Sequence, residues 1–132
     1  MQLNITTDYA IRIVLYLSTN MGEFISTKEL SENLCISRAY VTKIVKNMEK
    51  NNLVTIMRGN KGGVSLKKEP SNISILEVIS VMESTIKINR CLEEDEYCSA
   101  DRSDYCKVNK MYSKIQEQLE EELSKTTVDT LV

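Results

Sequence analysis

The sequence predicts a mainly α-helical protein with one small β-hairpin. Two segments begin with a Ser-x-x-Glu capping box, at Ser26 and at Ser74, and this pattern is typical of helix starts. Apolar residues recur at helical spacing in several stretches, of which residues 107–125 form the longest. A short run of branched residues at 53–57 is followed by three glycines close together, which predicts a chain reversal and a hairpin.

The first predicted helix covers residues 8–21 and is capped by Thr6 or Thr7. Its apolar residues recur every three or four positions, so one face should enter the core. Asp8 lies in the first turn, where a carboxylate interacts favourably with the helix dipole. From periodicity alone, this helix-end role is the expected one for Asp8.

The next two predicted helices are joined by a tight turn. The capping box at Ser26 begins the first of them, and Ser37 is placed to cap the second, which covers residues 38–51. Cys35 and Ile36 form the turn, and we expect Cys35 to be a small buried apolar residue. Helix, turn, helix and hairpin in this order predict a winged helix-turn-helix domain.

Basic residues are concentrated in this domain. Between Arg38 and Lys68 there are eight basic residues and one acidic residue, a local charge of +7, although the net charge of all 132 residues is −2. A basic segment within an acidic chain indicates a polyanionic partner, and the motif indicates double-stranded DNA. The alternative is a solvated helix face beside a charged hairpin.

The motif also assigns roles to the polar side chains of this segment. The helix at 38–51 would lie in the major groove, and the hairpin would contact phosphates or an adjacent minor groove. We expect base contacts from Arg38, Tyr40 and Thr42, phosphate contacts from Lys43, Lys46, Arg58 and Lys61, and a further hairpin contact from Asn60.

The remainder of the chain is predicted to contain a helix at 75–83, an extended segment at 84–90, a loop and a long helix. The long helix has one apolar stripe, which either forms a dimer interface or packs against its own domain. We expect three parts: a DNA-binding domain at 1–83, a cysteine-rich loop at 84–106, and a dimerisation helix with a tail at 107–132.

Three cysteines lie in the predicted loop with the spacing Cys91-x6-Cys98-x7-Cys106. The spacings are wider than the close pairs of zinc knuckles, and the chain has no histidine. Thiolates also hold iron–sulfur clusters, which usually take four protein ligands. A metal or cluster site would therefore need an oxygen, an exogenous thiol or a residue of another subunit. Redox-active thiols are the alternative.

Several of these motifs together resemble the IscR/NsrR family of bacterial winged-helix repressors. They are Thr7-Asp-Tyr-Ala-Ile-Arg12, Ile36-Ser-Arg38, Arg58-Gly-x-x-Gly-Gly63 and the late cysteine loop. The resemblance implies a homodimer that pairs through the long helix and binds a palindromic operator. It also implies an iron–sulfur cluster in the loop that controls operator affinity.

Within the family, the nitric-oxide-sensitive branch resembles this chain most. That branch implies a 4Fe–4S cluster held by Cys91, Cys98 and Cys106, with Asp8 of the other subunit as the fourth ligand. A 2Fe–2S cluster is the other type found in the family, but it is completed there by a histidine that this chain lacks. The loop spacings are longer than those usual for the nitric-oxide-sensitive branch.

The residue inventory also narrows the class of protein. Without histidine, a phosphate-binding glycine loop or a paired-carboxylate motif, we do not expect an enzyme. No apolar stretch is long enough to span a membrane and the start does not resemble a signal peptide, so we expect a cytoplasmic protein. The rival hypotheses are a thiol-based or iron–sulfur-status regulator of the same fold, and a non-catalytic metal or iron–sulfur carrier.

Overall fold

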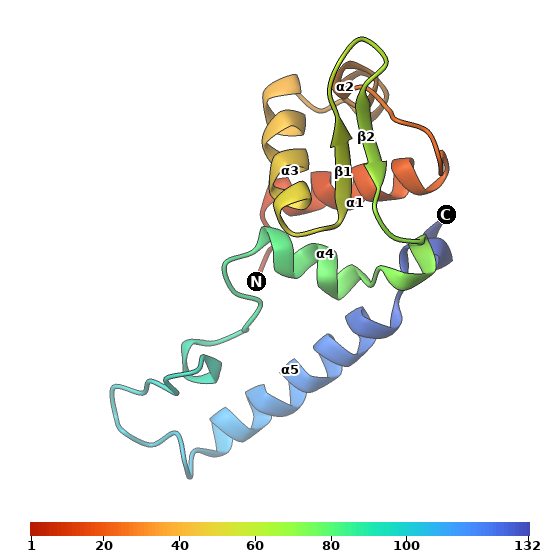
Figure 1. Ribbon diagram of the computed structural model, residues 1–132. Coiled ribbons are helices and arrows are strands. Elements are labelled where there is room, and N and C mark those ends of the chain that lie inside the picture. The colour runs from red at the N-terminus through yellow and green to blue at the C-terminus, as the bar shows by residue number, and fades with distance from the viewer.

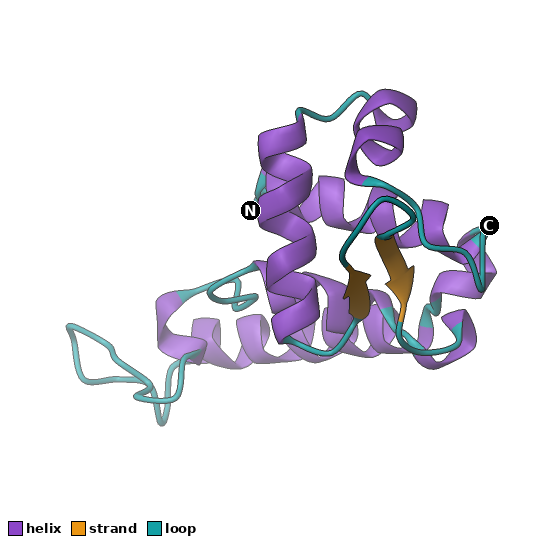
Figure 2. Cartoon of the chain, turned by 45° about the horizontal axis from the view of Figure 1, so that its top comes forward, coloured by secondary structure: helices purple, strands orange, loops and turns teal.

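The computed structural model describes residues 1–132 and contains five α-helices and one antiparallel hairpin. In chain order the helices and strands are α1 (Ile5–Ser18), α2 (Thr27–Leu34), α3 (Arg38–Lys50), β1 (Val54–Met57), β2 (Gly63–Leu66), α4 (Ile75–Met82) and α5 (Lys107–Lys125). Figures 1 and 2 show α1 to α4 and the hairpin as one compact head, with α5 below it. The predicted winged helix-turn-helix is confirmed.

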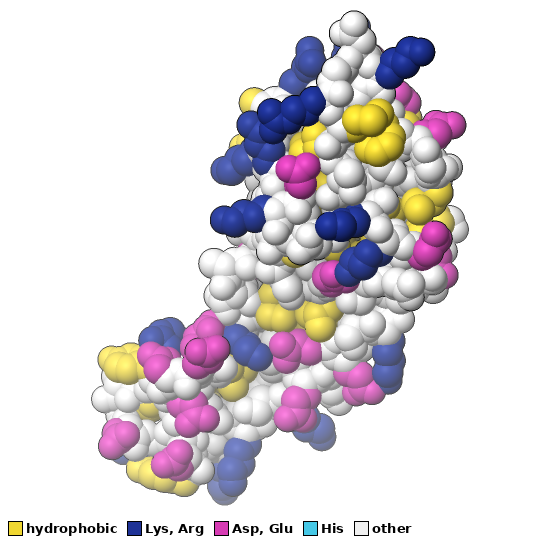
Figure 3. All heavy atoms as spheres, viewed as in Figure 1, with side chains coloured by type: hydrophobic (Ala, Val, Ile, Leu, Met, Phe, Trp, Pro, Cys, Tyr) yellow, Lys and Arg dark blue, Asp and Glu magenta, His cyan; other side chains and the backbone are white.

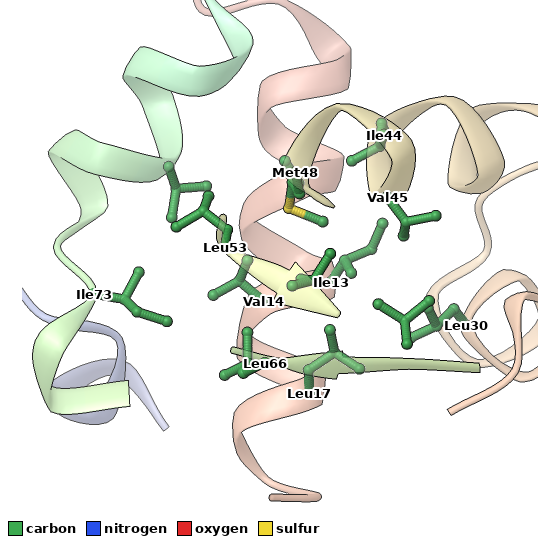
Figure 4. Close-up of a cluster of buried hydrophobic side chains, with 14 of the residues drawn as sticks. Ile13, Val14, Leu17, Leu30, Ile44, Val45, Met48, Leu53, Leu66 and Ile73 are labelled. Carbon is green, nitrogen blue, oxygen red and sulfur yellow. The ribbon is translucent and has the colours of Figure 1, made fainter. Parts of the chain in front are cut away.

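The head is built around one apolar core. Helix α1 contributes its buried face at helical spacing, and Ile13 and Leu17 are at most 1% exposed. They meet side chains from α2, α3 and both strands, among them Leu30 and Met48, as Figure 4 shows. Helix α3 therefore has one face fixed in the core, and its opposite face is presented to solvent.

The helix-turn-helix forms through the predicted caps. The Ser26 hydroxyl accepts a hydrogen bond from the Glu29 N–H at 3.1 Å, and the Ser37 hydroxyl accepts one from the Tyr40 N–H at 3.3 Å. The prediction for Cys35 is wrong, because this residue is exposed and Ile36 is buried instead. Cys35 ends α2 in a left-handed conformation, with φ of 54°, and that reversal brings Ile36 rather than Cys35 into the core.

The hairpin pairs Val54 with Leu66, and its second strand also pairs with Ile25 through Val64. The predicted glycine turn is confirmed, but only Gly59, with φ of 110°, needs a positive φ. Gly63 serves a different purpose, since a Cβ at this position would clash with the backbone of Ile25. Close approach of a third segment is thus the reason for glycine at the start of β2.

Helix α1 begins earlier than predicted. Its N-cap is Asn4, and Thr7 is buried rather than capping, with its hydroxyl donating to the Glu83 carboxylate at 2.5 Å. The same carboxylate accepts from the Asn4 N–H and from Asn4 Nδ2, both at 2.7 Å. A residue just after α4 therefore holds the N-terminus of α1, which is the helix that carries Asp8.

The environment of Glu83 makes stability depend on pH. The Thr7 hydroxyl, followed by the Asn4 N–H, lowers the pKa of Glu83 below its ordinary value of 4.5. A carboxyl whose pKa is lowered by folding stabilises the fold above its unfolded-state pKa, and this stabilisation is lost as the pH falls through the folded-state value.

We therefore expect Glu83→Gln to flatten the pH dependence of stability. Between about pH 5 and pH 3, the free energy of unfolding should fall less steeply for the variant than for the wild type. Urea unfolding followed by circular dichroism at several pH values measures this. Glu32→Gln, at an exposed site on α2, is the control. Parallel curves for the wild type and Glu83→Gln would rule out the proposed contribution.

The C-terminal part returns to the head. Segment 84–90, predicted to be extended, forms no strand but runs along α5, to which it is held by the buried Gln116. After α5, Val128 is fully buried in the core of the head, and its N–H donates to Ile73 O at 3.0 Å. The middle of α5 is thus tied to this segment, and the residues after its C-terminal end are tied to the head.

Candidate nucleic-acid interface and cysteine loop

The exposed face of α3 carries the side chains that the sequence predicted to contact DNA. Four residues of the opposite face are buried in the core, which fixes the rotation of the helix. All five of the predicted positions in this helix are exposed, namely Arg38, Tyr40, Thr42, Lys43 and Lys46. The structure therefore brings these five residues together on one solvent-facing surface.

The tip of the hairpin extends this surface. Arg58, Asn60 and Lys61 are exposed in the turn between β1 and β2. Figure 3 shows Lys and Arg side chains along α3 and beside the hairpin, whereas Asp and Glu gather over the segment between α4 and α5. In this view the basic residues of α3 and the hairpin thus lie apart from the acidic segment between α4 and α5.

The basic side chains of this surface are free of intramolecular ion pairs. All five salt bridges of the chain involve other cations, namely Arg12, Lys68, Lys87, Arg90 and Lys125. The single acid of the segment, Glu49, accepts a hydrogen bond from the Ile56 N–H at 3.1 Å. The positive charge of α3 and the hairpin therefore remains available to a polyanion.

The cysteine loop carries three free, half-buried thiols. Cys91 Sγ accepts from Asn89 Nδ2 at 3.1 Å, and Cys106 is the N-cap of α5, its Sγ accepting from the Asn109 N–H at 3.4 Å. Hydrogen bonds from the backbone N–H groups of Arg102 and Ala100 lower the pKa of the Cys98 thiol. Each sulfur thus has a polar hydrogen donor next to it.

The three sulfur atoms are not gathered into one site within a single chain. No group of three Cys, Asp or Glu side chains is arranged to hold a metal ion. Figure 1 shows the loop extending away from the head at the start of α5. The chemical type of the donors nevertheless fits an iron–sulfur cluster, since thiolates are its usual ligands.

Asp8 is half-exposed and is connected to the exposed surface of α3. Its carboxylate forms an ion pair with Arg12 at 2.6 Å. The Arg12 guanidinium lies over the Tyr9 ring, 5.4 Å from its centroid, and Tyr9 packs edge-on against Tyr40 of α3 at 5.7 Å between centroids. A continuous chain of contacts therefore links Asp8 to a residue predicted to contact bases.

Comparison with known proteins identifies the family. The model of the Rrf2 family, described as iron-dependent transcriptional regulators, matches residues 3–132. The chain belongs to the Rrf2 family. A regulator named NsrR from Bacillus licheniformis is 32% identical over 100 residues, which cover 74% of this chain and 70% of the relative. NsrR from Shouchella clausii is 32% identical over 96 residues, covering 72% and 64%.

Solved structures agree with the Rrf2 assignment. CymR, the global cysteine regulator of B. subtilis, superposes with a TM-score of 0.80 at 25% identity, covering 99% of this chain and 95% of CymR. IscR from T. potens gives a TM-score of 0.78 at 21% identity, covering 99% and 85%, a likeness of fold. As an Rrf2 member the chain is a DNA-binding transcriptional regulator, and it is not an enzyme.

Helix α5 of this Rrf2 protein presents an apolar stripe to solvent. Val108, Met111, Ile115 and Leu119 lie at helical spacing and are 40–51% exposed. Only the end of the predicted stripe, at Leu123, packs on the core of the head. None of the helices is both long and apolar enough to cross a membrane.

Sequence reasoning missed several residues that position the site. Glu83, Asn109 and Gln116 all act through hydrogen bonds to partners at least 18 residues away along the chain. A polar residue on the inner face of a predicted amphipathic helix was the available signal for Gln116. Nothing in the local sequence marked Glu83 or Asn109.

Proposed function

We propose that this Rrf2 protein is a homodimeric repressor whose affinity for its operator is controlled by an iron–sulfur cluster in the cysteine loop. The observation that carries the proposal is the set of three free, half-buried thiols in one loop, each next to a polar hydrogen donor. The description of the family as iron-dependent regulators supports it. Nitric oxide is the proposed signal, supported by the likeness to NsrR.

The proposed ligands are Cys91, Cys98, Cys106 and Asp8 of the other subunit. Three thiolates and one carboxylate suit a 4Fe–4S cluster, and a 2Fe–2S cluster is the alternative. When bound, the cluster would supply iron atoms that react with nitric oxide. The dimer would form through the exposed stripe of α5, because an apolar surface of this kind is stabilised by burial against a second copy.

The contacts of Asp8 suggest how cluster binding would change the affinity for DNA. In the structure Asp8 is paired with Arg12, which stacks on Tyr9, which in turn packs on Tyr40. If Asp8 were a ligand of the cluster, Arg12 would lose its ion-pair partner. Arg12 and Tyr9 would then shift, and the shift would be passed through Tyr40 to the exposed side chains of α3. A ligand shifts the equilibrium between two conformations only if its contacts differ between them. Asp8 would provide this difference, because it would be bound either to Arg12 or to the cluster.

On the operator, we propose base contacts from Arg38, Tyr40 and Thr42, near the start of α3. The proposed phosphate contacts are Lys43, Lys46, Arg58 and Lys61, and Asn60 approaches the minor groove from the hairpin. In a dimer, the two α3 helices would sit roughly 34–36 Å apart, one turn of DNA, and would contact the two halves of a palindrome.

The phosphate role of Lys61 is directly testable. We expect Lys61→Ala to weaken binding to operator and unrelated DNA alike and to reduce the slope of log K against log salt by about 1, because one counterion fewer is released. Fluorescence anisotropy titrations at several salt concentrations measure the slope. Lys114→Ala, at an exposed position of α5, is the matched control. An unchanged slope for Lys61→Ala would exclude a phosphate contact.

A thiol-based regulator of the same fold is the second candidate. It is favoured by the lowered pKa of Cys98, which increases the reactive thiolate form, and by the likeness to CymR. The two candidates differ in iron content. Protein purified without air would contain iron and sulfide if the cluster proposal holds, whereas a thiol switch would be colourless and would respond to oxidants.

A further inference from the structure

Polar side chains on one face of α5 hold the segment that leads into the cysteine loop. Gln116, only 3% exposed, donates from Nε2 to Ile86 O at 3.0 Å and accepts from the Ile88 N–H at 2.9 Å. One turn further along, Glu120 pairs with Lys87 at 3.3 Å. Segment 86–88 is therefore fixed in register on the helix, three residues before Cys91.

Asn109 occupies the same face of α5 two turns before Gln116, and it contacts two of the three cysteines. Its backbone N–H donates to Cys106 Sγ at 3.4 Å, and its side-chain Nδ2 donates to Cys91 O at 3.3 Å. It also lines, together with Cys91 and Ser113, a cavity of about 230 Å³ beside the loop. One half-buried residue thus joins, through its backbone N–H and its side chain, two cysteines that lie 15 positions apart in the sequence.

We propose that Asn109 is a positioning residue that fixes Cys91 relative to Cys106 and so presets two of the three thiols for cluster binding. The inference rests on the proposed function. Groups that hydrogen-bond to the ligands of a metal site fix their orientation, and their loss typically weakens metal binding. Asn109 acts on the backbone of Cys91 and on the sulfur of Cys106, so it would orient ligands without being one.

The substitution Asn109→Asp separates this role from helix capping. An acidic residue in the first turn suits the helix dipole, and the backbone N–H to Cys106 is retained. The carboxylate cannot donate to Cys91 O, so the link between the two cysteines is lost. Asn109→Ala removes the same link without adding charge. Asn33→Ala is the matched control, because Asn33 is a helical asparagine whose Nδ2 donates to the backbone oxygen of Glu29.

The first experiment uses the full-length protein loaded with iron and sulfide without air. We expect both Asn109 variants to change the visible circular dichroism spectrum and to release iron to a chelator about tenfold faster than the wild type or more. Asn33→Ala should match the wild type, and the melting temperature of metal-free Asn109→Asp should be unchanged. Wild-type spectra and wild-type iron release in both Asn109 variants would overturn the proposal.

The second experiment uses metal-free protein, so it tests Asn109 even if the wild type binds no iron and the proposed function fails. Diamide is added to reduced protein, and each disulfide formed passes two electrons and two protons from a pair of thiols to diamide. Peptide mapping identifies the pairs. We expect Cys91–Cys106 to be favoured over pairs with Cys98 in the wild type and in Asn33→Ala, and this bias to disappear in Asn109→Ala. An absent bias in the wild type, or one that persists in the variant, would overturn the proposal.

Discussion

A heterodimer that pairs an Asp8→Ala chain with a Cys98→Ser chain is expected to retain one stable cluster per dimer. In the proposed arrangement, each cluster takes three thiolates from one chain and a carboxylate from the other. The Asp8→Ala chain has an intact cysteine loop, and its partner supplies an intact Asp8. The second site of the same dimer lacks both Cys98 and Asp8, so it should be empty.

Two different affinity tags isolate this heterodimer for iron and sulfide counts. We expect about half the wild-type iron, released to a chelator at the wild-type rate. The Cys98→Ser homodimer should hold no iron. The Asp8→Ala homodimer should lose its iron quickly, because one iron atom of its cluster would lack a protein ligand. If the heterodimer loses its iron as fast as the Asp8→Ala homodimer, Asp8 does not act across the dimer.

Arg38→Ala is expected to cost discrimination at one base pair of each half-site, on the order of 1–3 kcal/mol. Arg38 is the first residue of α3, is exposed and forms no ion pair within the chain. An arginine at this end of a recognition helix can donate two parallel hydrogen bonds to the O6 and N7 of a guanine. Competition titrations with operators substituted at single positions would locate that base pair.

Arg38→Lys is the control for charge. Lysine keeps the positive charge but lacks the planar fork of arginine, so general affinity for DNA should be retained while discrimination falls. Unrelated DNA should bind Arg38→Lys and the wild type equally well. If Arg38→Ala loses the same affinity on every sequence, Arg38 contacts phosphate rather than a base.

Local signals in the sequence predicted the DNA-binding domain well. The caps at Ser26 and Ser37 form as expected, and the apolar spacing within α3 identified its buried face, because both depend on residues within one or two turns. The exposed positions of α3 followed directly from that spacing. This is why the predicted DNA-contacting side chains lie on one surface.

Features that depend on distant partners could not be predicted in the same way. Thr6 or Thr7 was expected to cap α1, but the buried Thr7 hydroxyl donates to a carboxylate 76 residues away, and the helix starts at Ile5 with Asn4 as its N-cap. Cys35 was expected in the core, but the left-handed end of α2 leaves it exposed. In both cases tertiary contacts or a backbone reversal outweighed the local preference.

In the cysteine loop, too, some features could be predicted from local signals and others depend on distant partners. Spacing and residue type identified Cys91, Cys98 and Cys106 as candidate ligands, because thiol chemistry is a property of the residues themselves. Two of these cysteines are linked through Asn109 of α5, which no local pattern indicated. The segment before Cys91 is held by Gln116, for which the only sequence signal was its polar side chain on the inner face of the helix. Asp8 was linked to the loop only through resemblance to the family, and its pairing with Arg12 and its path to Tyr40 emerged from the fold.

The most direct test is an absorption spectrum of wild-type protein kept without air, recorded before and after nitric oxide is added. Iron and sulfide contents and the affinity for the operator are measured on the same samples. We expect coloured protein with equal amounts of iron and sulfide, about four of each per chain, and operator binding that weakens once nitric oxide bleaches the spectrum. Colourless, iron-free protein that binds its operator equally well with and without nitric oxide would contradict cluster control of this repressor.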